Sequence, residues 1–243
     1  MKRIIYTVDV EKDLHSNTYK GITEGLKRFE ILCDNPRIKP ILFVTCDCIE
    51  KHPEIFRKLH KKGWEISLHA YRHERFDELN LKEKEEALKK SILCFKKHLN
   101  IKPKGFRAPQ HSIDDETLDL LEKHGFEYDS SYTPLNFLQL VFFPKKLNLW
   151  AKTTFSSLNP YKIRKNLLEL PPSSFFVPFV SLTLRIFPKF LLKPYVGIIS
   201  SICKKPMFYA HSWDFIELKK SRVDRTFPYT KFLDKLDYVM SLK

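Results

Sequence analysis

The chain has 243 residues, and 43 Lys and Arg against 29 Asp and Glu give it a formal net charge of +14 at pH 7. This length is sufficient to bury a sizeable core, and we expect residues 1–243 to form a single domain. The positive charge predicts an anionic partner, which could be a nucleic acid, a phosphorylated sugar or an anionic lipid surface. No apolar stretch reaches the roughly 20 uncharged residues that a membrane-spanning helix needs, so no such helix is expected.

The cysteines and the first residues indicate the cellular compartment. Five cysteines are an odd number and form no Cys-x-x-Cys pair, which is typical of reduced thiols in the cytosol. The apolar run after Met1-Lys2-Arg3 is interrupted by Asp9, too early for the core of a signal peptide. We therefore expect a cytoplasmic protein.

The amino-terminal half alternates buried strands with helices. Apolar runs predict strands at residues 4–8, 40–44 and 64–69, and helical spacing predicts helices at 22–33, from Pro53 onward, and at 81–99. The last of these helices has the clearest pattern, because its apolar residues share one face and its charged residues pair one turn apart.

The carboxyl-terminal half is less regular. The pattern predicts an extended segment at 103–109, a helix at 115–124 that Gly125 ends, strands at 126–129, 166–170 and 207–210, and a closing helix with apolar residues from 232 to 240. Residues 134–190 mix apolar and aromatic runs with Lys and Pro, and we interpret them as an apolar-basic insertion in the domain.

Strands that alternate with helices predict an α/β fold with a mainly parallel sheet, and about seven such units in one domain predict a distorted (β/α) barrel. In such barrels the catalytic groups lie at the carboxyl ends of the strands. The residues with suitable side chains near these ends are Asp9, Glu11, His69, His73, Arg107, Asp129 and His211. We expect them to converge on one rim.

Two histidines four residues apart, His69 and His73, are the first indication of a metal site. Imidazole nitrogens bind zinc, and a catalytic zinc ion commonly takes three protein ligands and a water. Asp9 or Glu11 could supply the third ligand. A chain with 9 His can also place two of them at this spacing by chance, so the pair alone does not establish the site.

A divalent metal ion, with zinc as the first candidate, would enable the residues of this rim to catalyse hydrolysis. Such an ion lowers the pKa of bound water toward roughly 7 and polarises a carbonyl group, but hydrolysis of an amide also needs a base for the water and an acid for the leaving amine. The second carboxylate and His211 could fill those roles. Arg107 could hold a carboxylate ionised, and Asp129 could tune a histidine.

Five segments resemble, in the same order, the motifs of the polysaccharide deacetylase family, also called the NodB-homology or carbohydrate esterase family 4 fold. They are Thr7-Val8-Asp9-Val10-Glu11, His69-Ala70-Tyr71-Arg72-His73, Gly105-Phe106-Arg107-Ala108-Pro109, Tyr128-Asp129-Ser130-Ser131 and Phe208-Tyr209-Ala210-His211-Ser212-Trp213-Asp214. Each motif is weak by itself, but five in order are specific, and they extend over nearly the whole chain.

The resemblance implies a distorted (β/α) barrel and metal-dependent removal of an N-acyl group, usually acetyl, from an amino sugar. It implies that Asp9 is the catalytic base and His211 the general acid. His69 and His73 resemble the metal ligands. Arg107 resembles the residue that orients the base, and Asp129 resembles the carboxylate that supports the acid.

The first motif departs from the commonest form of the family, which has two adjacent aspartates, the second of them a metal ligand. Val10 stands at that second position. The resemblance therefore implies Glu11 as the third ligand, although Asp9 could exchange roles with it. The Asp-Val-Glu form resembles a subgroup of exopolysaccharide deacetylases and, with Asp for Glu, the lipid-linked formyl-arabinose deformylases.

A cytoplasmic deacylase is expected to act on an anionic precursor, either a nucleotide sugar or a polyprenyl-phosphate-linked amino sugar, which a basic rim would attract. The apolar runs at 137–143 and 175–190, the second carrying Arg185 and Lys189, could lie peripherally on the inner face of the membrane. They could equally cover the barrel or form a dimer contact.

Two other functions stay open. The same fold could hydrolyse a cyclic ureide without a metal, although the intact His69, His73 and His211 favour the metal-dependent reaction. The chain could instead be a non-catalytic basic module that binds RNA. Against this, no nucleic-acid motif is present and the aromatic residues do not alternate with Lys and Arg, so we expect no nucleic-acid partner.

Overall fold

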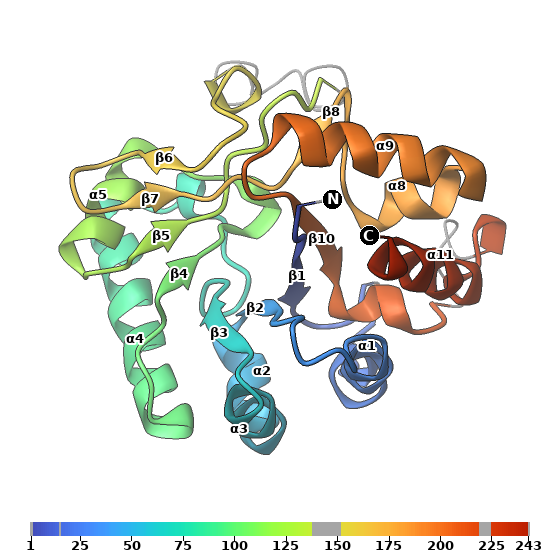
Figure 1. Ribbon diagram of the computed structural model, residues 1–243. Helices are drawn as coiled ribbons and strands as arrows, with labels where there is room; N and C mark the ends of the chain where they lie inside the picture. Colours follow the sequence, from blue (N-terminus) through green and yellow to red (C-terminus); the bar gives the residue numbers. More distant parts are fainter. Residues whose placement is uncertain (1, 15, 138–151, 219–224, 243) are drawn as a thin grey trace.

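The computed structural model describes residues 2–14, 16–137, 152–218 and 225–242 (Figure 1). Its strands are β1 (Ile5–Val10), β2 (Ile41–Val44), β3 (Glu65–Leu68), β4 (Gly105–Phe106), β5 (Tyr128–Asp129), β6 (Tyr161–Lys162), β7 (Leu168–Glu169), β8 (Ser174–Phe175), β9 (Val177–Pro178) and β10 (Met207–His211). Eight of them form one curved sheet in the order β10-β1-β2-β3-β4-β5-β7-β6, and β8 pairs with β9 in a small hairpin.

Seven strands of the large sheet are parallel, and β6 alone runs antiparallel to its neighbour β7. This confirms the predicted α/β fold with about seven parallel strands. Within the described residues the sheet does not close, because β10 and β6 are its two edge strands. The barrel is therefore distorted by an opening between its first and last strands.

Helices cover the outer side of the sheet. They are the π-helix η1 (Gly21–Gly25), α1 (Leu26–Leu32), α2 (Cys46–Lys51), α3 (Pro53–Lys61), η2 (Phe76–Glu78), α4 (Leu81–Leu99), η3 (Pro109–His111), α5 (Asp115–Lys123), α8 (Ser181–Ile186), α9 (Lys189–Ile202), η5 (Ser212–Phe215) and α11 (Tyr229–Ser241). Figure 1 shows α1 to α5 around strands β1 to β5, whereas α8, α9 and α11 lie together beside β10.

Helix α4 shows how the sequence defines an element. Asn80 accepts a hydrogen bond from the backbone of Glu83, whose own side chain accepts one from the backbone of Asn80, which is a capping box. Asn100 ends the helix in the left-handed conformation, which asparagine adopts more readily than most residues. The apolar face between these caps, including Leu88 and Phe95, is buried in the main core as predicted.

The sequence pattern missed three helices. Helix α2 has six residues and follows β2 directly, too short for a periodic pattern. Helix α8 is equally short, and α9 contains Pro194 and few charges, so neither has the alternation of apolar and charged faces that identifies α4. Both α8 and α9 lie in or next to the predicted insertion at 134–190. The run at 137–143 falls mostly outside the described residues.

Among the described residues, no helix combines the length and the apolar character needed to cross a lipid bilayer. The longest, α4, has 19 residues and is rich in Lys and Glu.

Asp114 connects α4 to α5, and its replacement should test this contact. Its carboxylate caps α5 by accepting a hydrogen bond from Thr117 N at 2.9 Å. The same carboxylate lies 2.6 Å from Nζ of Lys84, whose side chain is only 2% exposed. We expect Asp114→Ala to lower the free energy of unfolding by about 2 kcal/mol, because it removes both the cap and a partner of a buried ammonium group. Asp114→Asn retains the cap and should cost about 1 kcal/mol.

Equilibrium unfolding in urea measures both losses. The matched control is Glu116→Gln, which removes the other, more exposed partner of Lys84 but no cap, and should cost less than about 1 kcal/mol. Equal losses in Asp114→Ala and Glu116→Gln would show that the cap contributes nothing.

Candidate active site

The strand register brings the predicted residues to one rim. Asp9 lies beside His211 on β10 and beside Phe43 on β2. His69 follows the last residue of β3, and Arg107 follows the last residue of β4. Because all these strands are parallel, their carboxyl ends meet at the same edge of the sheet.

Asp9 and Arg107 form a buried ion pair at the centre of this rim. Nη1 of Arg107 donates to Oδ1 of Asp9 at 2.9 Å, and the two side chains are 0% and 3% exposed. Burial by itself raises the pKa of Asp9, but the positive charge of Arg107 and of nearby histidines outweighs it and holds the pKa below its ordinary value. Asp9 is therefore an ionised carboxylate.

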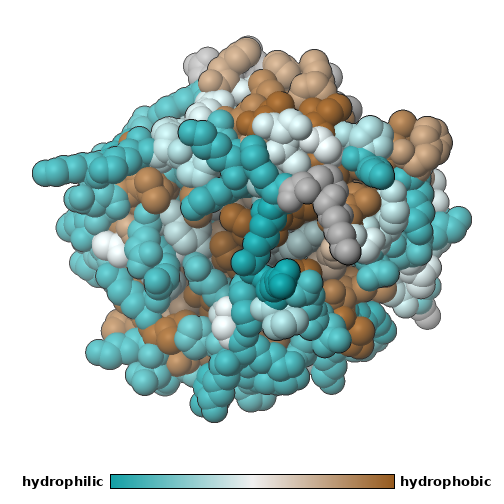
Figure 2. Space-filling model, viewed as in Figure 1, coloured by the Kyte–Doolittle hydropathy of each residue, from teal (hydrophilic) through white to brown (hydrophobic). Residues whose placement is uncertain are grey.

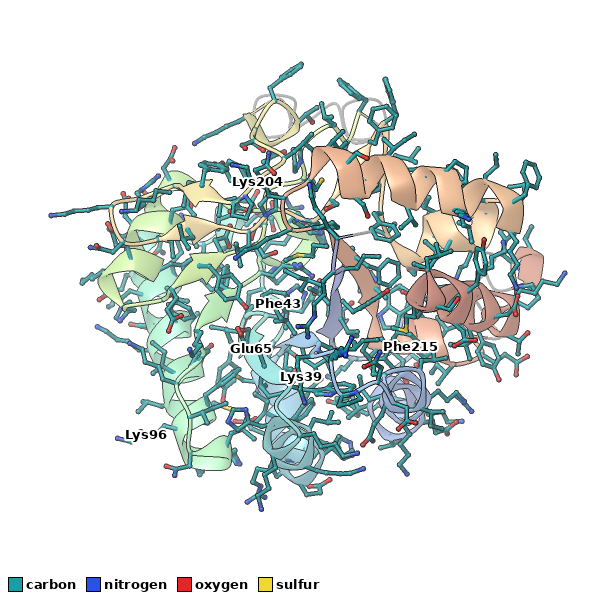
Figure 3. All side chains as sticks on the ribbon, viewed as in Figure 1. Lys39, Phe43, Glu65, Lys96, Lys204 and Phe215 are labelled. Atoms are coloured by element: carbon teal, nitrogen blue, oxygen red, sulfur yellow. The ribbon has the colours of Figure 1, made fainter. Side chains whose placement is uncertain are left out.

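The guanidinium of Arg107 is fixed on all sides. It donates to Thr7 Oγ1 at 3.0 Å and to Ser130 O at 3.1 Å. Its central carbon lies 4.1 Å from the ring centroid of Phe43 and 5.1 Å from that of Tyr209. Figure 3 labels Phe43 on the concave face of the sheet, between the two halves of the molecule. Arg107 therefore cannot leave Asp9 without leaving these partners.

His69 is held with one ring nitrogen available. Its Nδ1 lies 2.7 Å from the backbone oxygen of Arg107, and since a carbonyl oxygen only accepts, Nδ1 is the donor. Nε2 therefore carries the lone pair and lies 3.6 Å from Oδ2 of Asp9. Burial lowers the pKa of His69, which favours the neutral imidazole that a metal ion requires.

Glu11 and His73 complete a possible ligand set. Oε2 of Glu11 lies 2.5 Å from Nε2 of His73, and one ligand atom from each of Glu11, His69 and His73 lies within 4.8 Å of the other two. Burial would raise the pKa of Glu11, but the hydrogen bond from His73 lowers it to about 2. Two imidazoles and one carboxylate suit a divalent ion such as zinc, so these residues fit the predicted metal.

The loop that carries His73 has an unusual backbone. Ala70 and His73 have φ angles of 69° and 68°, which are uncommon for residues other than glycine. The backbone N–H groups of Tyr71 and Arg72 both donate to the carboxylate of Glu74, at 3.0 and 2.8 Å. These bonds stabilise the turn that brings His73 back toward Glu11.

His211 is supported from behind by Asp214. Nδ1 of His211 lies 3.5 Å from Oδ2 of Asp214, which also accepts from the backbone N–H of His211 at 2.9 Å. Arg185 donates to the backbone oxygen of Asp214 at 3.0 Å. Burial lowers the pKa of His211, but the hydrogen bond and charge of Asp214 outweigh it, so the net shift is upward. The group is therefore suited to donating a proton.

Asp129 does not have the predicted place. In the described part of the chain, the carboxylates that lie within 4.0 Å of the imidazole of His211 are those of Asp214 and Glu11, whereas Asp129 accepts from Ser131 N at 3.0 Å and Ser131 Oγ at 2.7 Å. Ser131 Oγ in turn accepts from Ala108 N at 2.8 Å. Because β2, β3 and β4 separate β5 from β1 in the sheet, and β10 lies on the other side of β1, Asp129 instead fixes the backbone that follows Arg107.

Arg185 belongs to a segment for which the sequence left a membrane surface, a cover over the barrel and a dimer contact open. Its side chain is buried and donates to Asp214 O and to Phe227 O, so it is not directed at lipid headgroups. The sequence could not decide this, because an arginine between apolar residues on a short helix has the same pattern whether it faces a membrane or a buried carboxylate.

Three site residues were not singled out from the sequence. His111 lies next to Tyr209, with ring centroids 5.3 Å apart, and its Nδ1 is 3.2 Å from Ser131 O. Burial and the nearby charge of Arg107 lower its pKa to about 3, so it is neutral. Tyr209 Oη lies 2.6 Å from Nε2 of His211. The third residue is Glu169, and the segment before it has no periodic pattern of apolar residues that could have indicated a site. For His111, the only indication in the sequence was its position shortly after the extended segment predicted at 103–109.

Glu169 and Asp129 form a buried pair of carboxyl groups on the neighbouring strands β5 and β7. Burial raises the pKa of both groups, and the negative charge of Asp129 raises the pKa of Glu169 further, whereas the hydrogen bond from Glu169 lowers that of Asp129, so the pair shares a proton that Glu169 carries. Oε1 of Glu169 accepts from Tyr132 N at 3.1 Å. The pair thus joins the loop after β5 to β7.

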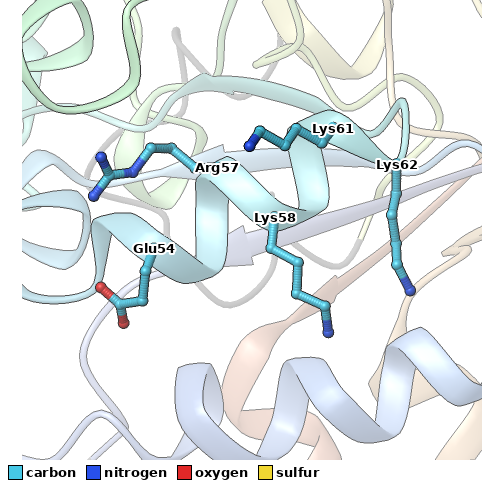
Figure 4. A pocket seen from close by; sticks show the side chains of 5 residues that line it. All are labelled: Glu54, Arg57, Lys58, Lys61 and Lys62. Carbon is cyan, nitrogen blue, oxygen red and sulfur yellow. The ribbon is translucent and has the colours of Figure 1, made fainter.

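Positive charge elsewhere on the surface does not mark this rim. A hollow of about 550 Å³ on α3 is lined by Glu54, Arg57, Lys58, Lys61 and Lys62 (Figure 4). Figure 4 shows Lys58 and Lys62 pointing toward a neighbouring helix, where Glu30 of α1 binds both ammonium groups. None of the residues that line the hollow belongs to the rim. The candidate site is therefore identified by the contacts among the ionisable residues of the rim, not by this hollow.

Comparison with known proteins gives matches in sequence. The family model named Polysaccharide deacetylase matches residues 6–128. A peptidoglycan deacetylase of Helicobacter pylori is 31% identical over 148 residues, covering 61% of this chain and 50% of that protein. The peptidoglycan deacetylase-like protein FGM2 of Gibberella zeae is 30% identical over 139 residues, covering 53% of this chain and 40% of that protein. The matched region thus spans half or less of each relative.

Solved structures share the fold. A Mycobacterium smegmatis protein described as a polysaccharide deacetylase superposes with a TM-score of 0.71 at 17% identity, covering 99% of this chain and 84% of that one. The PuuE allantoinase superposes with a TM-score of 0.66 at 14% identity, with coverage of 99% and 84%. At these identities the likeness concerns the fold, and it confirms the distorted barrel.

The shared proton of Asp129 and Glu169 predicts a pH dependence. A group whose pKa is raised by folding stabilises the protein below its unfolded pKa and loses that contribution as the pH rises through the folded value. Glu169→Gln replaces the protonated carboxyl by a neutral amide of the same shape. We therefore expect wild type to lose stability relative to Glu169→Gln as the pH rises from about 4.3, the ordinary pKa of a glutamate, toward the raised pKa of the folded protein.

Urea unfolding at several pH values measures this difference. The control is Glu127→Gln, an exposed glutamate just before β5, whose stability should run parallel to that of wild type. A constant difference between wild type and Glu169→Gln across this range would mean that the two carboxyl groups are not coupled.

Proposed function

Because the chain belongs to the polysaccharide deacetylase family, we propose that it is a metal-dependent hydrolase that removes an N-acyl group, in the first instance acetyl, from an amino sugar. One observation carries this proposal. An ionised Asp9, a ligand set of two histidines and a glutamate, and a proton-donating His211 lie together at one rim of the barrel.

Glu11, His69 and His73 would hold the metal ion, for which zinc is the first candidate. The ion would polarise the amide carbonyl of the substrate and lower the pKa of the attacking water. Glu11 is favoured over Asp9 as the carboxylate ligand, because its ligand atom clusters with those of His69 and His73, whereas Asp9 is bound by the guanidinium of Arg107. Trp213 Nε1 lies 3.3 Å from Oε1 of Glu11 and orients that carboxylate.

Asp9 and His211 would move the two protons of the reaction. Asp9 accepts a proton from the water as its oxygen attacks the acyl carbon. His211 donates a proton to the sugar nitrogen as the carbon–nitrogen bond breaks, which releases a carboxylate and a free amine. Arg107 and Asp214 are positioning residues in this scheme, since each acts through the catalytic side chain that it contacts.

The finer identity of the substrate is also a proposal. We propose one domain acting in the cytoplasm on an anionic amino-sugar precursor, linked to a nucleotide or to a polyprenyl phosphate. The net charge of +14 supports an anionic substrate through electrostatic attraction. The names of the two sequence relatives support a glycan substrate class.

Peripheral contact with an anionic membrane would suit a lipid-linked substrate. Helices α8 and α9 expose large apolar side chains, among which Phe190 is 74% exposed. The others are Leu182, Ile186, Leu191 and Ile198. Exposed lysines lie at both ends of α9, and Figure 3 labels Lys204 beyond its last turn. Figure 2 shows hydrophobic side chains toward the upper right of the view, where α9 lies, next to hydrophilic ones. Apolar residues flanked by cations favour anionic lipid.

Sedimentation with anionic vesicles tests this contact. We expect the protein to pellet with phosphatidylglycerol vesicles at low salt and to pellet less at high salt. We expect Phe190→Ser to weaken this binding several-fold, because it removes an aromatic ring that would insert into the lipid interface. Ile31→Ser is the matched control, since Ile31 is also 74% exposed but belongs to α1. No binding at low salt, or equal loss in both variants, would refute the contact.

A second hydrolytic function has one supporting observation, the fold shared with an allantoinase. Such a reaction would open a cyclic ureide without a metal. The ligand set of Glu11, His69 and His73 favours the deacetylase, because these three residues have no evident role in a reaction without metal.

His69→Ala should separate the two reactions. We expect this variant to bind about one divalent ion fewer than wild type by elemental analysis and to release acetate from N-acetylated sugar nucleotides or lipid-linked sugars at least about 100-fold more slowly. His60→Ala, on the exposed side of α3, serves as the control and should match wild type. Unchanged metal content together with ureide hydrolysis in both variants would favour the second function.

A further inference from the structure

A second group of possible metal ligands lies on the helical layer, outside the rim. Glu50, Cys94 and His98 each offer one ligand atom, and these three atoms lie within 4.8 Å of one another. None of them contributes to the rim that contains Glu11, His69 and His73.

The fold brings these residues together in a simple way. Cys94 and His98 are four residues apart on α4, so their side chains lie on the same face one turn apart. Glu50 comes from the last turn of α2, which packs against α4. The packing is tight where the helices meet, because Cys94 Sγ lies 3.7 Å from Cys46 O and Cys46 Sγ lies 3.8 Å from Ser91 O. Figure 3 labels Lys96 on the outer side of the same helix, two residues after Cys94 in the sequence.

The chemistry of the three side chains is complementary. Thiolate sulfur, imidazole nitrogen and carboxylate oxygen are the ligands that zinc takes in proteins, at roughly 2.3, 2.0 and 2.1 Å. Tetrahedral ligands at such distances lie less than about 4 Å apart, so a spacing of at most 4.8 Å needs only a small closure of the side chains. A thiolate and a carboxylate would also neutralise a divalent charge.

Burial and orientation support a built site. Cys94 is only 5% exposed, His98 is partly buried and Glu50 is exposed, so the set opens to solvent on one side, where a water could complete the coordination. Tyr71 Oη donates to Oε1 of Glu50 at 2.7 Å. Such a hydrogen bond from a neighbouring residue commonly fixes a carboxylate that binds a metal.

We propose that Glu50, Cys94 and His98 form a second metal site, which binds a thiophilic divalent cation such as zinc. The ion would act as a cross-link between two helices. It joins α2 and α4, and through Tyr71 it reaches the loop that carries His73. Two backbone hydrogen bonds strengthen that connection, from Cys46 N to Ala70 O at 3.3 Å and from Asp47 N to Tyr71 O at 3.1 Å.

Cobalt(II) distinguishes this site from the rim. Only the second site has a sulfur ligand, so only it produces the intense near-ultraviolet charge-transfer absorption of a cobalt–thiolate bond. We expect metal-free wild type, reduced and titrated with cobalt chloride, to bind two equivalents and to show this absorption in proportion to one of them. Zinc chloride should abolish the absorption by displacement.

Single substitutions test which residues bind the metal at the second site. Cys94→Ala should lose the absorption and one equivalent of metal, whereas Cys33→Ala, another buried cysteine, should retain both. His98→Ala and Glu50→Gln alter less buried side chains and should weaken cobalt binding at this site at least about 10-fold without unfolding the protein. His73→Ala should remove the other equivalent and retain the absorption.

Thermal unfolding gives an independent measurement. Zinc should raise the melting temperature of His73→Ala, in which only the second site remains, and should have no effect on a His73→Ala/His98→Ala double variant. Absence of the charge-transfer absorption in wild type, or its persistence in Cys94→Ala, would overturn the proposal. Neither result bears on the proposed hydrolysis, because that reaction depends on the rim.

Discussion

The buried ion pair between Arg107 and Asp9 is the contact on which the rest of the rim depends. Two opposite charges removed from water are tolerated only when their remaining hydrogen-bonding groups are satisfied. Arg107 meets this requirement through Thr7, Ser130 and two aromatic rings, and its own backbone oxygen binds His69. One residue after β4 thereby fixes the charge of a carboxylate on β1 and the tautomer of a histidine after β3.

Some functional residues of the rim lie on regular strands, and others lie on less regular backbone. Asp9 and His211 are strand residues paired across β1 and β10, which suits groups that must keep a constant distance. His73 lies in a loop and His111 ends the short helix η3, and their φ angles are 68° and 55°. Strained residues of this kind are held only where the surroundings determine them, and here the partners are Glu11 and Ser131.

The sequence was sufficient for those parts of the fold that depend on local pattern. Strand runs that end in Asp9, His69 and His211 predicted the parallel sheet, and α4 was predicted with its observed bounds because caps and periodicity agree there. The sequence was insufficient where tertiary contact decides. The support of His211 by Asp214 instead of Asp129 depends on which strands are neighbours, and the burial of Arg185 depends on a carboxylate 29 residues away.

The stacking of Trp213 on His211 has an optical consequence. The two rings are 4.1 Å apart between centroids and 13° from parallel, and the indole N–H faces Glu11. Indole emission is sensitive both to an adjacent charged imidazole and to a change at its own N–H group. Since the chain contains only three tryptophans, the intrinsic fluorescence of the unmodified protein carries a signal from the centre of the rim. Events at Glu11 and His211 can thus be followed in real time without a chromogenic substrate or an attached dye.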